Sequence, residues 1–115
     1  MSSRNDKERL KDILESTEAI LSYTKNLTYE QFAGDRKTNR AVSFELVVIG
    51  EAVSRLSEDV EKRYADLPWR EMNAVRNYAV HEYFRLSLPI LWQIASVELP
   101  QLLERLQKIY MEIEE

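Results

Sequence analysis

The chain has 115 residues, and its 16 lysines and arginines against 20 aspartates and glutamates give a formal net charge of −4 at pH 7. It has no cysteine and one histidine, His81, which excludes thiol catalysis, disulfide scaffolds, zinc fingers and a histidine-rich metal site within one chain. The length predicts a single domain over residues 1–115, with a core that needs no metal. We therefore expect no metal site and no cofactor.

The composition predicts long helices with short connections, because only 2 glycines and 3 prolines interrupt the chain. No apolar run approaches the roughly 18–20 residues that span a bilayer, and the N-terminal segment lacks the apolar region of a secretory signal. These features predict a cytoplasmic protein with no membrane partner. The acidic balance argues against a non-specific nucleic-acid coat but is compatible with a local basic pocket.

The first predicted helix covers about residues 4–26. Its apolar positions recur at steps of three and four, at Leu10, Ile13, Leu14, Thr17, Ile20, Leu21 and Thr24. A short helical turn follows over residues 28–32, where Thr28 and Gln31 have the spacing of a capping box.

The second long helix is predicted from about Lys37 to Ser57. One line along it passes through Phe44, Val48, Ala52 and Arg55, and a second passes through Leu46, Ile49, Val53 and Leu56. Two neighbours should therefore cover this helix, from its own bundle or from another subunit. Gly50 costs about 1 kcal/mol in a helix interior, which indicates a close helix crossing. Glu51 either is exposed on the helix rim or is partly buried or directed at a polar cavity.

The remaining segments predict three further helical elements. Residues 58–66 form a short helix or turn, and Pro68 fits the first turn of a third long helix over Trp69–Phe84. A fourth helix is predicted over Ser87–Val97, and Pro100 restarts or kinks the last one. The sum is an all-α, single-domain bundle of four to five helices.

Four polar side chains share one half of the third long helix. At about 100° per residue, Arg76 and Tyr83 lie about 20° apart, and Asn77 and His81 stack on an adjacent line. Spacing alone also allows a structural explanation, in which the histidine bonds a carboxylate or carbonyl and the arginine packs on the tyrosine. The functional alternative is a site, because a cation, an amide, an imidazole and a phenol project from one broad half of a single helix.

The stretch Arg76–Tyr83 resembles the R-N-x-x-x-H-x-Y signature of HEPN-domain proteins, specifically of the HepT-like toxins. The resemblance extends over nearly the whole chain, because segments similar to the family's occur in the expected order at Val48–Ala52, Leu67–Trp69, Leu91–Trp92 and Leu99–Leu102. One departure is Ala74, where the family often has glycine.

The resemblance implies a HEPN-like bundle that forms a homodimer, with the motif helices near the two-fold axis. It also implies a metal-independent ribonuclease toxin of a type VII-like toxin–antitoxin pair, encoded beside an MNT-type nucleotidyltransferase antitoxin. In that family the antitoxin transfers AMP to the motif tyrosine, which matches Tyr83 and would make it O-AMP-tyrosine.

The chemistry of RNA cleavage fits these residue types. We expect His81 to transfer protons and Arg76 to bind phosphate oxygens, as the two catalytic residues. Asn77 and Tyr83 would orient the imidazole or the substrate, and Glu51 would anchor Arg76 or His81. A second imidazole would come from the other subunit. The alternative is a non-catalytic helical subunit that binds nucleotides or serves as a scaffold for a nucleotidyltransferase.

Overall fold

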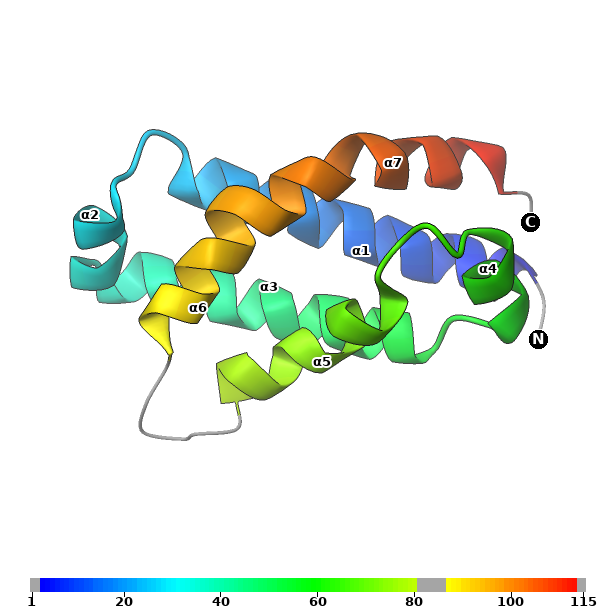
Figure 1. Cartoon of the computed structure of the whole chain (residues 1–115), viewed down its shortest axis with the longest axis horizontal. Coiled ribbons are helices and arrows are strands. Elements are labelled where there is room, and N and C mark those ends of the chain that lie inside the picture. The colour runs from blue at the N-terminus through cyan, green and yellow to red at the C-terminus, as the bar shows by residue number, and fades with distance from the viewer. Residues whose placement is uncertain (1–2, 81–86, 114–115) are drawn as a thin grey trace.

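The computed structural model describes residues 3–80 and 87–113, and within these ranges all regular secondary structure is helical (Figure 1). The elements are α1 (Ser3–Thr24), α2 (Tyr29–Gly34), α3 (Arg36–Ser54), α4 (Glu58–Arg63), α5 (Trp69–Val80), α6 (Leu88–Gln93), a π-helical turn η1 (Ile94–Glu98) and α7 (Leu99–Glu112). The predicted all-α class is confirmed. No helix of the described ranges is long and apolar enough to cross a membrane.

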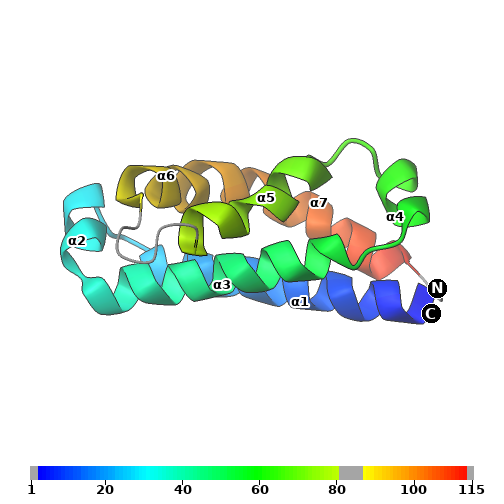
Figure 2. The same ribbon diagram turned by 90° about the horizontal axis from the view of Figure 1, so that it is seen from below.

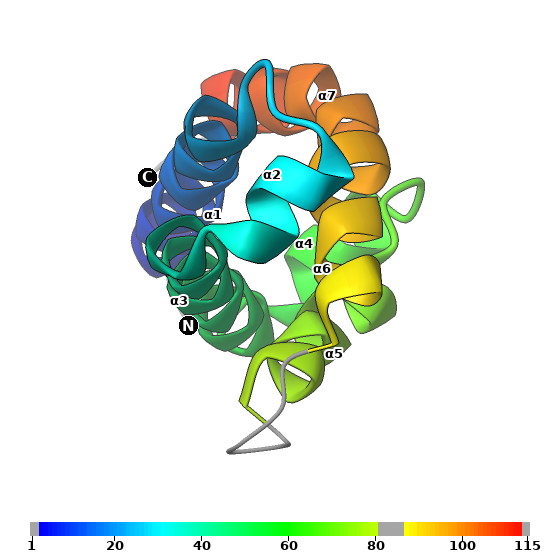
Figure 3. The same cartoon turned by 90° about the vertical axis from the view of Figure 1, so that its left-hand side faces the viewer.

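Four long units make up the bundle: α1, α3, α5 and the continuous but bent rod of α6, η1 and α7 (Figures 1 and 2). Helix α3 lies between α1 and α5, and α7 lies along the other side of α1 (Figure 3). The core contains the predicted stripe of α1 and the predicted α3 line through Leu46, Ile49 and Val53. The prediction that the other α3 line would be covered is wrong at Phe44, whose side chain is 64% exposed. The most buried large side chains include Leu10, Ile13, Ile20, Phe32, Leu46, Ile49, Leu91, Leu106 and Ile109.

The ends of the first helices follow local chemistry. Helix α1 ends at Thr24, and Asn26 takes a positive φ of 63°, which asparagine tolerates better than most residues. The capping box predicted for α2 is confirmed, because the Thr28 side chain accepts from the Gln31 backbone N–H and the Gln31 side chain accepts from the Thr28 N–H.

The prediction that the second long helix reaches Ser57 is wrong, because α3 ends at Ser54. Ser57 instead begins α4, where its Oγ accepts from the Val60 N–H. Its own N–H and Oγ–H donate to the buried Asp6 carboxylate at 3.0 and 2.7 Å. A residue that caps the next helix and binds α1 cannot also continue α3.

The prediction that the fourth helix ends near Val97 is also wrong. Ser87 precedes α6 without a side-chain cap bond, and the helix continues through η1 into α7. Pro100 has no N–H and its ring excludes the carbonyl four residues earlier, which disfavours an ordinary α-turn there. The chain accommodates this by a π-turn, in which the Leu99 N–H donates to the Ile94 carbonyl five residues back.

Candidate functional site

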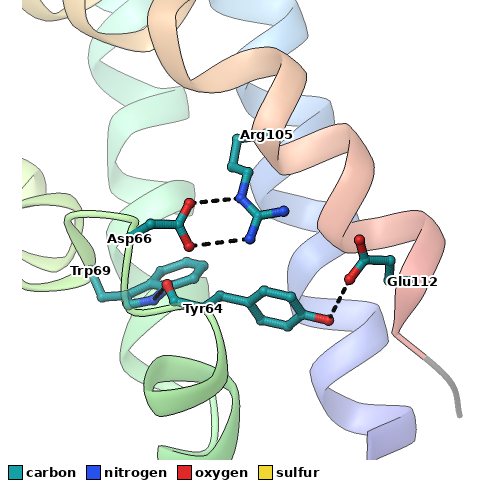
Figure 4. Close-up of polar contacts among 5 residues, drawn as sticks. All are labelled: Tyr64, Asp66, Trp69, Arg105 and Glu112. Atoms are coloured by element: carbon teal, nitrogen blue, oxygen red, sulfur yellow. Dashed lines mark hydrogen bonds and ion pairs between the residues drawn. The ribbon is translucent and has the colours of Figure 1, made fainter.

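A cluster of polar contacts joins α7 to the connection between α4 and α5 (Figure 4). The buried Trp69 donates its indole N–H to the Tyr64 carbonyl at 3.0 Å, and the Tyr64 hydroxyl donates to Glu112 at 3.3 Å. Arg105 binds Asp66 through two nitrogens at 2.7 and 3.2 Å, which lowers the pKa of the Asp66 carboxyl from its ordinary value. These contacts hold the connection between α4 and α5 against α7.

Helix α5 crosses α3 closely at Gly50. A Cβ placed at that residue would lie 2.9 Å from the Arg76 Cβ and 3.1 Å from the Asn73 carbonyl oxygen. One neighbour is a main-chain atom of α5 and the other is attached directly to that main chain, so neither can move aside by a side-chain rotation. The helix crossing predicted from Gly50 is therefore present, and the residue that it brings against α3 is Arg76.

Arg76 and Glu51 form an ion pair across this crossing. The Arg76 Nη1 donates to the Glu51 Oε2 at 2.5 Å, with the two side chains 35% and 51% exposed. Of the two placements expected for Glu51, the rim placement holds, and the carboxylate also contacts a predicted catalytic residue. The pair leaves the remaining guanidinium nitrogens of Arg76 for another acceptor, because arginine has five N–H donors.

Asn73 was not singled out by the sequence, although it lies one turn before Arg76 on the same side of α5. Its Oδ1 is buried and has no hydrogen-bond partner within residues 3–80 and 87–113. A buried amide oxygen without a partner is uncommon in proteins. The signal in the sequence was a polar residue next to Met72, on the flank of the helix that the crossing buries.

Two of the predicted site residues, His81 and Tyr83, lie outside the described residues, as does the end of the third predicted helix at Phe84. Asn77 lies in the last turn of α5 as described, next to Arg76 in sequence. The structure thus brings together Glu51 and Arg76, while the places of His81, Tyr83 and the Asn77 side chain stay predictions. In the described ranges no three acidic or imidazole side chains gather in an arrangement that could hold a metal ion.

A cavity of about 580 Å³ lies between α5 and the rod of α6 and α7. Its lining is mostly apolar and includes Met72, Val75, Ile90, Ile94, Leu99 and Leu102. Among the residues that the structure describes, the charged ones that line it are Glu71 and Glu98.

Alanine at Gly50 should destabilise the protein, although alanine favours helix by about 1 kcal/mol over glycine. The added Cβ forces α5 away from α3, and overpacking of this kind costs about 1–3 kcal/mol. We expect a net loss of about 1 kcal/mol in the free energy of unfolding, measured by urea denaturation. Gly34→Ala is the control, because a Cβ there meets nothing within 4 Å; equal effects of the two substitutions would contradict a tight crossing at Gly50.

Comparison with known proteins identifies the family. The model of the family described as Ribonuclease HepT-like matches residues 13–109, which include Gly50, Glu51 and the whole stretch Arg76–Tyr83. The chain belongs to this HepT-like family. No solved structure matches it.

Several relatives of the HepT-like chain align over most of both sequences. Two proteins of Methanocaldococcus jannaschii, both named provisionally as RNases, are 37% and 35% identical to it. These alignments cover 91% and 99% of this chain and 87% and 94% of the relatives. A Thermococcus cleftensis protein named Probable ribonuclease HepT is 34% identical over 92% of this chain and 96% of its own length.

Proposed function

We propose that this HepT-like chain is a metal-independent endoribonuclease and the toxin of a type VII-like toxin–antitoxin pair. The observation that carries the proposal is the placement of Arg76, which Glu51 and Gly50 hold at the crossing of α3 and α5 within the segment that the family shares. The names of the relatives, which refer to RNases, support the substrate class.

The reaction needs a base, an acid and a cation, and no metal takes part in the proposed mechanism. The RNA 2′-OH loses its proton to a His81 imidazole and attacks the adjacent phosphorus, while the bond to the 5′-oxygen breaks. A second imidazole gives that oxygen a proton, and the products carry a 2′,3′-cyclic phosphate and a 5′-OH. Arg76 stabilises the charge of the phosphorane, and Asn77 and Tyr83 orient the imidazole or the substrate.

A homodimer would supply the second imidazole, because the chain contains one histidine. A two-fold interface near the motif helices would place two copies of His81 and two of Arg76 in one composite site. The same arrangement would concentrate positive charge in a protein whose formal net charge is −4.

Tyr83 is the proposed target of an MNT-type nucleotidyltransferase partner. Its hydroxyl oxygen would attack the α-phosphate of ATP, losing its proton as pyrophosphate leaves, and AMP would then occupy the phosphate position beside Arg76. Incubated with the partner and ATP, the chain should gain about 329 Da per AMP in its intact mass. Tyr83→Phe should gain nothing and Tyr78→Phe should behave as wild type; a mass gain in the Tyr83 variant would place the acceptor elsewhere.

The alternative function is a non-catalytic subunit that binds nucleotides or serves as a scaffold for a nucleotidyltransferase. Expression in cells distinguishes the two. A ribonuclease toxin should arrest growth, and co-expression of the nucleotidyltransferase should relieve the arrest. Normal growth on expression of the chain alone, with RNA bound but intact after long incubation with purified protein, would favour the alternative.

A further inference from the structure

The outward face of α3 carries a row of cations around one exposed aromatic ring. We propose that this face, formed by Arg36, Lys37, Arg40, Phe44 and Arg55, binds the RNA strand on either side of the cleavage site. The proposal rests on the ribonuclease function proposed above and names the residues that hold its substrate outside the site itself.

Helix geometry places these side chains on one face. At about 100° per residue, all five lie within about 60° of Glu51 around the helix axis, and all five are exposed. Viewed along the bundle, α3 contacts α1 on one side and α5 on the other, and its remaining side turns away from the other helices (Figure 3). The face is therefore open to a ligand.

The charge of this face is opposite to that of the whole chain. It has four cations, Arg36, Lys37, Arg40 and Arg55. The one carboxylate among them, that of Glu51, is paired with the guanidinium of Arg76 on α5. None of the four forms an ion pair within the part of the chain that the structure describes. Unpaired cations in a row bind a phosphate backbone, since each contact releases counterions.

Other acidic groups lie along the edges of this face and not between its cations. On the α1 side, a shallow hollow is lined by Asp12, Glu15 and Glu45, and Glu45 accepts a hydrogen bond from Tyr23. At the start of α3, the Asp35 carboxylate accepts from the Thr38 N–H and hydroxyl. A polyanion is thus repelled from the α1 flank and directed along the face toward Arg76.

Phe44 supplies what a purely electrostatic surface lacks. Its side chain is 64% exposed and is not part of the core. Such exposure is unusual for a phenylalanine. Proteins that bind single strands combine a cationic groove with aromatic rings on which bases stack. Phe44 lies about 10 Å along α3 from Glu51, so a strand with a base on this ring has its next phosphates within reach of Arg76.

The length of the face suits a short single strand. Residues 36 to 55 span roughly 28 Å of helix, which corresponds to about eight stacked nucleotides at 3.4 Å each. The probe we choose is therefore a fluorescent 2′-O-methyl RNA of about ten nucleotides. It lacks the 2′-OH nucleophile, so binding is measured without cleavage.

Binding of this probe, measured by fluorescence anisotropy over a salt series, tests the proposal. Phe44→Ala and Phe44→Leu should both weaken binding by roughly 5- to 100-fold without changing the salt dependence. Arg40→Ala should weaken binding and reduce the slope of log affinity against log salt by about 0.7. The controls are Met111→Ala, at another exposed apolar side chain, and Lys62→Ala, at another exposed cation, and both should bind as wild type.

Three results would overturn the proposal. The first is wild-type binding by both Phe44→Ala and Arg40→Ala, and the second is full binding by Phe44→Leu, which keeps the apolar area but not the ring. The third is a change of oligomeric state in Phe44→Ala, seen by light scattering, with RNA binding intact, because this face would then be a protein interface. If the wild type cleaves RNA but the Phe44 and Arg40 variants bind the probe as tightly as wild type, this proposal alone is contradicted. If the substitutions weaken binding as expected but the wild type cleaves no RNA, the ribonuclease function alone is contradicted.

Discussion

Replacing Arg76 by alanine should lower the rate of RNA cleavage by about 10²–10³-fold, the effect of removing one preorganised donor to a transition-state oxyanion. The Glu51 pair and the crossing at Gly50 fix this guanidinium before substrate binds, so little of its electrostatic effect is lost to reorganisation. The fold should tolerate the change, because the pair is partly exposed and such pairs contribute about 0.2–1 kcal/mol. Cleavage rates and urea denaturation measure the two effects.

Arg105→Ala is a matched control for the arginine experiment. Its side chain is 35% exposed, as is that of Arg76, and it also pairs with a half-exposed side chain, that of Asp66. Loss of cleavage in the Arg76 variant alone would assign the effect to the site rather than to net charge. Arg76→Lys should recover part of the rate, because it keeps the charge but not the two-pronged contact. Equal rates for Arg76→Ala and Arg105→Ala would contradict the role of Arg76.

His81→Ala should lower the cleavage rate by about 10²–10⁴-fold, the usual contribution of general acid–base catalysis. The effect should lie at the upper end, because the chain has one histidine and a composite site would lose both its base and its acid. Binding of the 2′-O-methyl RNA should remain, since the cations of α3 and Arg76 are unchanged. Loss of binding together with cleavage would indicate a structural role for the imidazole.

Hydrophobic periodicity predicted the helices that bury a continuous stripe. The steps of three and four in α1, and the line through Leu46, Ile49 and Val53 in α3, correspond to buried residues. A short polar signal also worked where it acts locally, at the Thr28 capping box. These features depend on contacts within a few residues, which a sequence displays directly.

Other features depended on partners far along the chain. The local sequence predicts that Ser57 ends a helix. Its hydrogen bond to Asp6, 51 residues earlier, instead holds it as the N-cap of α4. Pro100 alone predicts either a restart or a kink of the last helix, and the π-turn before it keeps α6 and α7 continuous. Each element has two local solutions, and tertiary packing selects one of them.

The candidate site was predictable only in part, because its contacts also join residues that are far apart in the sequence. An interior glycine indicates a close approach whatever the partner is, so Gly50 predicted a crossing without identifying Arg76 as the residue against it. Glu51 had two candidate placements, and the choice depended on where α5 crosses. The position of Asn73 next to Met72 did not predict its burial, because an amide beside an apolar stripe is equally consistent with an exposed position.

Cleavage of RNA by purified wild-type protein and His81→Ala, with EDTA present, tests the central claim most directly. We predict that the wild type cuts and leaves 2′,3′-cyclic phosphate ends, while the variant, at matched purity and with the same unfolding curve, does not. Undiminished cleavage by His81→Ala, or wild-type cleavage that stops in EDTA and returns with a divalent cation, would contradict it.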